Sequence, residues 1–583
     1  MSERIDLIWL SQDRTAPKWS LGQVWVTEPL PSSLHHLVEE KLPESEAVAW
    51  LFWDATLGEP KLERVQEALK RPGDLWHAGL RLGMSGLPGL MDFVNPTWML
   101  NRDPDKDIEA TSWRLSLQAC LVRTDVLRQM GGPKPTFLTL AGASLEMGHR
   151  YITRGVLMRH LPWLLEVEAE KGIDGDMEKR GKGETDRQGN GETEIALCYQ
   201  FSNSPIPRFS DSLPFEDELR FVYYRFGRFW TRWALMRAVM SRYVPLSKAL
   251  KAWWRVRNEP RPPEPAPYTH PSSNANIPSE PKVSVLIPTI DRYPYLRTLL
   301  NQIRQQTVKP LEIIIVDQTP LEGRETSLAD EFSDLPLRII YRDQPGQCSS
   351  RNAGLYQARG DFILFLDDDE EVPPTLIEDH LKTLERFQAD VSSGVADEVG
   401  AGPLPEAFTY LRVSDVFPMG NTLIRKDVLY RSGLFDLAYE RGQRADGDLG
   451  MRVYLSGALM VLNPNIRILH HHAPRGGLRV HKARVITYAS SRKYITHRHL
   501  PSVTEIYLAK RYFKPRQVRE ELWLRALGTL SLRGPWWKRL LKIILGTLLL
   551  PDTWWKIRDR YFLATEMLKK FPQIPVFARH DET

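Results

Sequence analysis

Cysteine is scarce in this sequence. Three occur in 583 residues, at positions 120, 198 and 348, far apart from one another. This number and spacing exclude a disulfide framework and a Cys-x-x-Cys metal site, and favour a reducing compartment. A signal-peptide run is also missing, because three of the first six residues are charged. We therefore expect a cytoplasmic protein.

A long apolar run and a large net charge are missing as well. The stretch 540–550 is about half the roughly 20 residues of a spanning helix, and Lys542 interrupts it. Lys and Arg exceed Asp and Glu by five, too few to demand a nucleic-acid partner. We predict no transmembrane segment and no nucleic-acid function.

The small net charge hides two strongly basic segments. Residues 219–257 contain ten Lys or Arg and no acid, and residues 510–560 contain thirteen against four acids. Both contain several tryptophans. We predict basic, aromatic helices that either pack on the globular domains or make a peripheral contact with the inner face of a membrane. Binding of a polyanion is a third alternative.

Length and composition predict several globular domains. Residues 259–281 are rich in proline and indicate an extended linker, whereas the charged, glycine-bearing stretch at 166–196 indicates a disordered insert. The predicted order is a domain at 1–165, the insert at 166–196, a basic aromatic helical segment at 197–258, the linker at 259–281, a domain at 282–490 and a basic helical region at 491–583.

The fold class is predicted to be α/β. After the linker, short apolar runs of strand type alternate with helical patterns such as 295–306. This alternation indicates a mostly parallel sheet with helices on both faces, in which ligands bind beyond the carboxyl ends of the strands. The strand-type runs are residues 283–287, 311–316, 337–341 and 362–366.

The first part of the chain resembles the second. Shifted by 302 positions, residues 121–162 align with 423–464 without a gap and with thirteen identities. Both copies precede a basic aromatic stretch. We interpret this as an internal duplication, with chance similarity as the alternative.

Three consecutive aspartates, Asp367, Asp368 and Asp369, end one of the apolar runs. Crowded carboxylates raise one another's pKa unless a cation or solvent compensates them. Oxygen ligands of this kind suit Mg²⁺ or Mn²⁺. A solvated acidic turn is the alternative reading of this motif alone.

The second part of the chain contains five motifs in this order: VSVLIPTIDR, EIIIVDQTP, GQCSSRNAGL, GDFILFLDDDE and GLFDLAYERGQRADGDLGMRVYLSG. Together they resemble the family 2 glycosyltransferases, over roughly residues 281–475. The resemblance implies a GT-A nucleotide-sugar fold, in two copies here. It also implies a metal-dependent, inverting transfer of a sugar from a nucleotide diphosphate to an acceptor hydroxyl.

The resemblance also implies roles for individual residues. Asp368 belongs to the nucleotide-sugar site, Asp367 is expected to bind ribose or metal-bound water, and Asp369 the metal itself. His470 is expected to complete the metal site, although His471 and His472 are adjacent alternatives. The remaining nucleotide contacts would come from Thr289, Asp291, Asp317 and Arg351.

The catalytic base implied by the resemblance is Asp446. Family members commonly have Glu-Asp-x-Asp here, and this chain replaces the first Glu by Ala445. Asp448 is expected to cap a helix that begins near Leu449. A glycine pair at 476–477 resembles a loop that could close over the donor.

The first copy lacks these groups. At the same offset Asp446 corresponds to Ser144 and Asp448 to Glu146, and the strand-like 50–57 offers only Asp54. Because serine cannot accept the acceptor's proton unaided, we expect a degenerate GT-A-like domain without transfer activity.

The leading hypothesis is therefore a cytoplasmic glycosyltransferase, with peripheral membrane contact as one alternative for its basic helices. It would act on a glycan or lipid-linked acceptor, in polysaccharide, glycolipid or cell-envelope synthesis. Two alternatives stay open. One is a nucleotidyltransferase on the same fold, although IPTIDRYPYL lacks the glycine-rich basic signature usual after its first strand. The other is a non-catalytic sugar- or lipid-binding scaffold.

Overall fold

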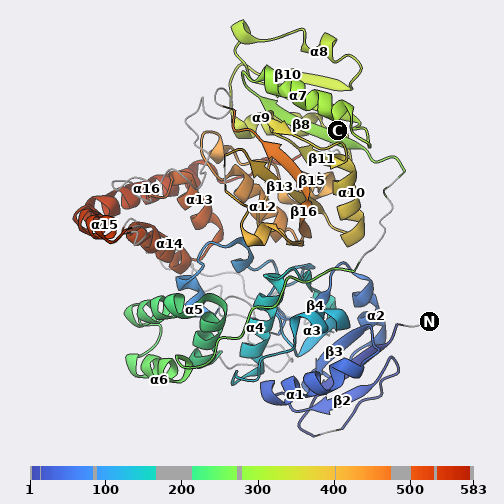
Figure 1. Cartoon of the computed structure of the whole chain (residues 1–583), viewed down its shortest axis with the longest axis vertical. Coiled ribbons are helices and arrows are strands. Elements are labelled where there is room, and N and C mark those ends of the chain that lie inside the picture. Colours follow the sequence, from blue (N-terminus) through green and yellow to red (C-terminus); the bar gives the residue numbers. More distant parts are fainter. Residues whose placement is uncertain are drawn as a thin grey trace, which may run out of the picture.

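A computed structural model of the whole chain describes residues 3–577 except 14, 83–87, 166–212, 272–276, 278, 401, 474–499, 529 and 531–534. The predicted insert at 166–196, the glycine pair at 476–477 and Cys198 lie outside the described residues. Two sheets dominate the described part, one in residues 3–165 and one in residues 279–473 (Figure 1). The predicted α/β class is confirmed.

The first sheet contains seven strands in the order β2-β1-β3-β6-β4-β7-β5. Its centre is apolar on both faces, as in β1, in which every residue is buried. β1 pairs in parallel with β2 and β3, β4 pairs in parallel with β7, and the other pairs are antiparallel. The strands are β1 (Ile5–Leu10), β2 (Val24–Thr27), β3 (Ala49–Asp54), β4 (Leu75–His77), β5 (Ala110–Thr111), β6 (Ala119–Arg123) and β7 (Met158–His160).

The second sheet repeats this order with additions. Its nine strands run β10-β9-β8-β11-β15-β13-β16-β12, and β14 also pairs with β16. The strands are β8 (Val283–Thr289), β9 (Glu312–Asp317), β10 (Leu337–Tyr341), β11 (Phe362–Phe365), β12 (Glu370–Glu371), β13 (Val391–Glu398), β14 (Arg412–Val413), β15 (Thr422–Arg425) and β16 (Met460–His470).

The pairing registers of the two sheets agree at the predicted offset. β5 pairs with β7 through Ala110 opposite His160 and Thr111 opposite Arg159. β14 pairs with β16 through Arg412 opposite Leu462 and Val413 opposite Val461. Each residue of the second pair lies 302 positions after its counterpart in the first.

Helices cover both sheets. In the N-terminal half they include α1 (Pro31–Lys41), α2 (Leu62–Lys70), α3 (Thr124–Met130) and α4 (Leu140–Ile152). In the C-terminal half they include α7 (Tyr293–Arg304), α8 (Leu328–Glu331), α9 (Gln347–Gln357), α10 (Leu376–Phe387), α11 (Lys426–Ser432) and α12 (Ala445–Leu455). Proline near the first turn begins α1 and α7, where its missing N–H costs nothing.

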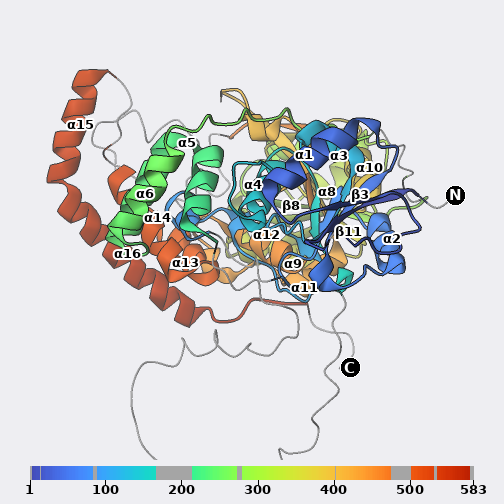
Figure 2. The same ribbon diagram turned by 90° about the horizontal axis from the view of Figure 1, so that it is seen from below.

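Each sheet is followed by helices that stand apart from it. α5 (Phe215–Met240) and α6 (Leu246–Val256) follow the first sheet, and α13 (Val503–Tyr512), α14 (Pro515–Gly528), α15 (Trp536–Leu548) and α16 (Leu550–Lys570) follow the second. Figures 1 and 2 both show α6 and α15 on the same side of the molecule. α5 contains a kink at Gly227, whose φ is 80°.

The two halves contact each other directly. The Tyr454 hydroxyl donates to the carbonyl of Arg102 at 2.9 Å, and the Trp98 indole N–H donates to Asp415 at 2.7 Å. The proline-rich stretch after α6 is extended and lies against the first half, where Tyr268 N–H donates to the carbonyl of Arg154. Among the described residues, no helix combines the length and apolarity needed to cross a bilayer.

Candidate functional site: an acidic cluster beyond strands β8 and β11

Polar side chains gather beyond the carboxyl ends of β8 and β11, which are neighbouring parallel strands. β8 ends at Thr289, and its hydroxyl donates to Asp368 at 2.8 Å. Asp368 follows β11 after a short turn. The structure therefore brings together two predicted site residues that lie 79 positions apart, at the edge where parallel sheets bind ligands.

Arg292, which no sequence motif predicts as a site residue, bridges two of the aspartates. Its Nη1 atom lies 2.8 Å from an oxygen of Asp368 and 3.1 Å from an oxygen of Asp369. Burial raises the pKa of Asp368 to about 6. At Asp369 burial acts in the same direction, but His470 and Arg292 outweigh it and hold the pKa of that carboxyl below its usual range. Arg292 thus offsets part of the charge of the cluster.

Asp367 makes a different contact. Its Oδ1 atom accepts a hydrogen bond of 2.8 Å from Arg351 on α9, and Arg351 also donates to the carbonyl of Gln347. The side chain of Asp367 is 35% exposed, against 4% for Asp368 and 2% for Asp369. Of the three carboxylates, Asp367 is therefore the one most open to a solute.

The three histidines at the end of β16 face different partners. His470 lies with Nε2 3.5 Å from Asp369, whereas His471 contacts Glu371 and His472 contacts Glu398. Burial lowers the pKa of His470, but Asp369 and the other carboxylates around it more than compensate and raise that pKa to about 11. The imidazolium therefore provides positive charge in a carboxylate-rich site.

The donor atoms around His470 suit a divalent cation in their chemistry. Carboxylate oxygens and an imidazole nitrogen are ligands of Mn²⁺ and, for the oxygens, of Mg²⁺. Among the described residues, the group with the spacing of a metal site is Glu398, His470 and His472, whose ligand atoms all lie within 4.8 Å of one another. The predicted set shares only His470 with this group: Asp369 lies 3.5 Å from His470, and Asp367 is not part of the group. An ion bound here would have to replace the proton on His470.

The remaining nucleotide residues predicted by the sequence lie at the same edge. Asp317 ends β9 and is buried, and its oxygens accept from the Tyr293 hydroxyl at 2.7 Å and from the Thr319 N–H at 2.9 Å. Asp291 is exposed just after β8, with a positive φ of 53°. Asp317 is thus held within the protein, whereas Asp291 faces solvent.

Asp446 lies in the first turn of α12 and is exposed. The loop before it is fastened to α9, because the Glu440 carboxylate accepts from the N–H groups of Cys348 and Ser349 at 2.9 Å each. α9 also carries Arg351. One helix therefore connects the loop that leads to Asp446 with the acidic cluster.

The expected capping role of Asp448 is wrong. α12 begins at Ala445 rather than near Leu449, so Asp448 lies inside its first turn. Asp448 is buried, pairs with Arg452 at 2.8 Å and accepts a hydrogen bond of 2.7 Å from the Tyr512 hydroxyl. It anchors α12 to α13 rather than ending the helix.

The side chains at the corresponding positions of the first half are buried. Ser144 is 1% exposed, and its hydroxyl donates to the carbonyl of Leu140. Glu146 is buried in an ion pair with Arg150. Asp54 accepts from the N–H and hydroxyl of Thr56. These groups are engaged in internal contacts.

Sequence reasoning missed three groups of this site. Arg292 directly follows Asp291 and could have been found from its position after the first strand. Glu398, at the end of β13, and Glu440, in a loop, carry no local pattern, because only the folded sheet brings them to this edge.

Acidic groups beside an arginine and a histidine thus lie beyond the carboxyl ends of parallel strands, where α/β sheets commonly bind ligands. Comparison with known proteins makes this specific. Residues 284–447 match the model of glycosyl transferase family 2. This match covers the segment in which the sequence motifs resemble the family.

Several curated proteins are similar over this region. The putative glycosyltransferase EpsH of Bacillus subtilis (strain 168) is 34% identical over 105 residues, which are 18% of this chain and 30% of that protein. The GalNAc(5)-diNAcBac-PP-undecaprenol beta-1,3-glucosyltransferase of Campylobacter jejuni is 33% identical over 95 residues, or 16% of this chain and 31% of that protein. The chain thus spans about a third of each of these relatives.

Among solved structures, S. aureus TarS 1–349 in complex with UDP-GlcNAc is similar over 52% of this chain and 94% of that chain. The TM-score is 0.32 and the sequence identity 16%.

Proposed function

We propose that the C-terminal half, residues 282–490, transfers a sugar with inversion from a nucleotide diphosphate to an acceptor hydroxyl. The observation that carries this proposal is the convergence of Thr289, the three aspartates at 367–369 and His470 at one edge of the second sheet. These residues come from three separate strands, and most of them lie within the family 2 segment.

In this proposal the nucleotide sugar binds along the edge formed by β8, β9 and β11. The side chains with solvent access, Asp291 and Asp367, contact the nucleotide directly. Arg351 supplies a fixed guanidinium that suits phosphate oxygens, and Asp317, Asp368 and Thr289 shape the pocket behind them.

Asp367, Asp369 and His470 would hold Mg²⁺ or Mn²⁺, and such an ion, when bound, neutralises charge on the diphosphate leaving group. Arg292 would also place positive charge at this edge, beside Asp368 and Asp369. Its contacts with Asp368 and Asp369 keep these carboxylates oriented toward the edge.

Asp446 is proposed as the catalytic base. An inverting transfer needs one carboxylate that takes the proton of the acceptor hydroxyl while its oxygen attacks the anomeric carbon. Exposure at the start of α12 leaves Asp446 open to an acceptor, in contrast to the buried, ion-paired Asp448.

The N-terminal half is proposed to be a degenerate copy, produced by duplication, without transfer activity. The shared strand order, the shared offset of 302 in β5–β7 and β14–β16, and the internal contacts of Ser144 and Asp54 support this. We propose that it serves as a scaffold for the catalytic half, which it contacts through Arg102 and Trp98.

The acceptor is proposed to be a glycan or a lipid-linked glycan of the cell envelope, and the location to be the cytoplasm at the inner face of the membrane. The printed activity of the Campylobacter relative, on an undecaprenol diphosphate-linked acceptor, supports this class. Donor binding is best tested by thermal shift with a panel of UDP, dTDP and GDP sugars, with and without Mn²⁺.

A metal-dependent rise in melting temperature for one sugar nucleotide supports the donor site. Slow Mn²⁺-dependent hydrolysis of that donor would then distinguish an enzyme from a binding scaffold. No shift and no hydrolysis with any donor would contradict the proposal, and release of pyrophosphate from a nucleoside triphosphate would favour a nucleotidyltransferase instead.

A further inference from the structure

Helix α15 is apolar and almost uncovered. In the sequence WWKRLLKIILGTL, Gly546 is the sole buried residue. Trp536 is 76% exposed and Leu548 71%, and further exposed apolar side chains lie between them. A helix that is apolar around most of its circumference ordinarily lies in a protein core or in lipid. Neither sheet covers this one.

Helix α6 shows a second exposed apolar stripe. Leu246, Leu250 and Trp254 follow one another at intervals of four, so they share one face, and all three are exposed. The opposite face is buried through Ala249, Ala252 and Val256. The part of α5 after its kink continues the surface with the exposed Phe229, Met236 and Met240.

Positive charge accompanies both apolar surfaces. α15 contains Lys538, Arg539 and Lys542 and no acid, and α6 contains Lys248, Lys251 and Arg255 and no acid. Trp536, Trp537, Trp254 and Trp555 add aromatic rings with a polar N–H. Tryptophan beside Lys and Arg on an apolar helix is the pattern of interfacial membrane binding.

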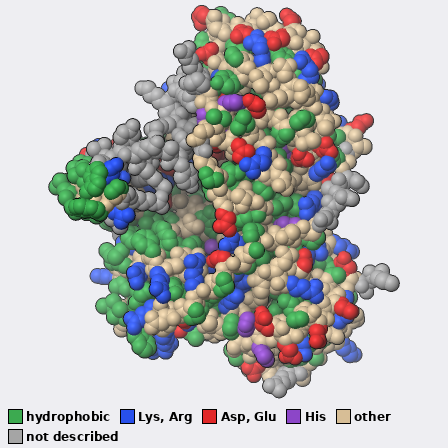
Figure 3. Space-filling model, viewed as in Figure 1, with side chains coloured by type: hydrophobic (Ala, Val, Ile, Leu, Met, Phe, Trp, Pro, Cys, Tyr) green, Lys and Arg blue, Asp and Glu red, His purple; other side chains and the backbone are tan. Residues whose placement is uncertain are grey.

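The two surfaces lie on one side of the molecule. Both ribbon views place α6 and α15 on the same side of the molecule, away from the sheets, although Figure 1 shows them set apart from each other (Figures 1 and 2). In the space-filling view, hydrophobic side chains gather over α15 and again over α5 and α6, with Lys and Arg between and around them (Figure 3). We call the exposed residues of α6, α15, α16 and of α5 from Arg228 onward the outer helical face.

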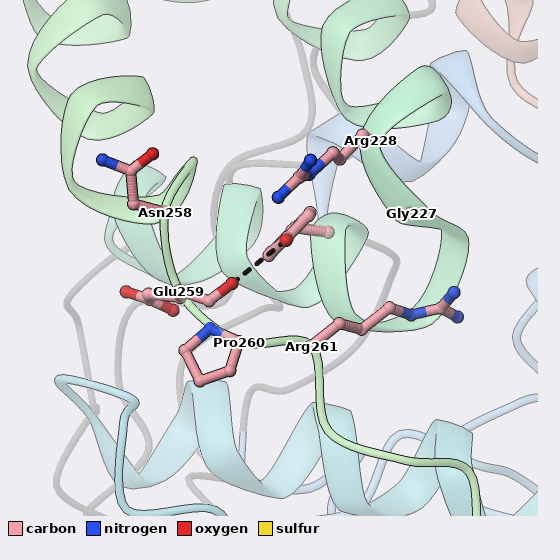
Figure 4. A pocket seen from close by; sticks show the side chains of 7 residues that line it. Gly227, Arg228, Asn258, Glu259, Pro260 and Arg261 are labelled. Atoms are coloured by element: carbon pink, nitrogen blue, oxygen red, sulfur yellow. Dashed lines mark hydrogen bonds between the residues drawn. The ribbon is translucent and has the colours of Figure 1, made fainter.

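A cavity lined by two arginines and Glu259 opens beside the outer helical face. It has a volume of about 560 Å³ and is lined by Tyr223, Gly227, Arg228, Arg261 and the turn 258–260. A neighbouring cavity of about 410 Å³ is lined by Arg228, Arg232, Trp253 and Arg257. Figure 4 shows the Arg228 guanidinium above the hydrogen bond between Tyr223 and the Glu259 carbonyl. Clustered guanidinium groups suit phosphate oxygens.

We propose that the outer helical face binds the surface of an anionic lipid bilayer, with α15 and the α6 stripe in the interface and Arg228, Arg232 and Arg257 against lipid phosphates. This deepens the proposed function by naming the surface on which the catalytic half works. A bilayer is favoured over a protein partner because an apolar stripe, tryptophan and several Lys or Arg without an acid in the same helix occur together in α6 and again in α15.

The test uses the full-length protein and vesicles, without any sugar nucleotide, so its outcome does not depend on the transferase proposal. Sedimentation with vesicles of phosphatidylcholine and phosphatidylglycerol should capture the protein, and vesicles of phosphatidylcholine alone should capture much less. Binding should weaken as salt is raised, because screening reduces attraction to the anionic surface.

Two exposed sites separate the apolar and electrostatic contributions. Ile544→Glu on α15 should weaken vesicle binding more than about tenfold, because it removes a large apolar side chain from the interface. Arg232→Gln should weaken it about fivefold, as expected for one cation near an anionic surface. Leu30→Glu, at an exposed apolar position before α1, is the matched control and should bind like the parent protein.

Equal capture by neutral and anionic vesicles would overturn the proposal, as would unchanged binding of Ile544→Glu with a melting temperature equal to that of the parent. If the parent protein instead forms a dimer in analytical ultracentrifugation that Ile544→Glu dissociates, and vesicles capture neither, a second copy rather than a bilayer covers α15.

Discussion

Arg150 and Arg452 make the same two contacts, one in each half of the chain. Each forms an ion pair with an acid four residues earlier on its own helix, Glu146 or Asp448. Each also donates from Nη1 to a backbone carbonyl at the end of the preceding helix, that of Met130 or of Ser432. Every residue of the second set lies 302 positions after its counterpart, so the correspondence extends from sequence to buried side-chain contacts.

The interface between the halves obeys the same relation. Gly155 faces the carbonyl of Leu411, and Gly457 faces the carbonyl of Glu109, again at an offset of 302. Reciprocal contacts of this kind define a two-fold, isologous interface in homodimers. We infer that one chain here contains the arrangement that two identical subunits would form.

Replacing either of these two glycines by alanine should therefore destabilise the protein to a similar degree. Both have positive φ, and a Cβ atom would lie 2.6 Å from the Leu411 carbonyl at Gly155 and 2.4 Å from the Glu109 carbonyl at Gly457. We expect Gly155→Ala and Gly457→Ala each to cost more than about 2 kcal/mol, from backbone strain and steric overlap. The measurement is the melting temperature of the full chain.

Gly58→Ala provides the control for strain alone, because Gly58 has a φ of 76° and nothing within 4 Å of its Cβ direction. It should cost about 1 kcal/mol. Equal effects at all three positions would show that the contact between the halves adds nothing.

Asp446→Asn should abolish transfer while leaving donor binding nearly intact. The amide cannot accept the acceptor's proton, so we expect a loss of about 10² to 10⁴ in kcat. Product formation and donor affinity are measured on the same preparation. Asp427→Asn, at a highly exposed aspartate on α11, should behave as the parent. Turnover of Asp446→Asn within a few-fold of the parent would exclude it as base.

Asp369→Asn should remove the metal-dependent part of donor stabilisation. At about a hundred times Kd a bound ligand stabilises the native state by about 2.7 kcal/mol, and the metal-dependent share of this should vanish. Thermal shift with and without Mn²⁺ measures it. The control is Asp361→Asn, an exposed aspartate at the opposite end of β11. If Mn²⁺ still enhances donor binding to Asp369→Asn, the ion is held elsewhere, and Glu398 with His472 becomes the donor set to test.

Acid should weaken the C-terminal half through His380. This buried histidine contacts Ser392 at 2.8 Å and Asn421 at 2.9 Å, and burial lowers its pKa from 6.5 to about 4. Between these values the unfolded chain binds the proton more readily than the folded one. The contribution of His380 to the free energy of unfolding is thus fully present above about pH 6.5. It falls by up to about 3 kcal/mol as the pH drops toward about 4.

His380→Gln should flatten this part of the pH dependence, measured as melting temperature between about pH 4 and pH 7. His36→Gln, at an exposed histidine on α1, should leave the slope unchanged. An unaltered slope in His380→Gln would assign the acid sensitivity to other groups.

Much of the fold was predictable because its signals are local. The run at 283–287 lies within β8, 337–341 coincides with β10, and the helix predicted at 295–306 overlaps α7. Continuous apolar runs of four to eight residues identify buried strands, and their alternation with helices determines the layers. The position of Asp367 beyond β11 followed from the same reasoning.

The parts of the site that escaped prediction depend on pairing between distant segments. Glu398 lies beside His470 because β13 and β16 pair in parallel. The residues around position 398 form no pattern that predicts this contact. The expectation for Asp448 is wrong because α12 begins at Ala445, directly after Arg444 with its positive φ of 79°, a turn earlier than the acidic pattern indicates. The metal ligands and the base stay predictions.

The hydrogen bond from Tyr454 to the Arg102 carbonyl bears on any effort to make a smaller enzyme. Tyr454 belongs to α12, the helix that begins beside Asp446, and Met99 from the other half lies against Gly450 of that helix. Removing the first half would take these two contacts away from α12, so a shortened protein would need new side chains along that surface before it could be expected to work.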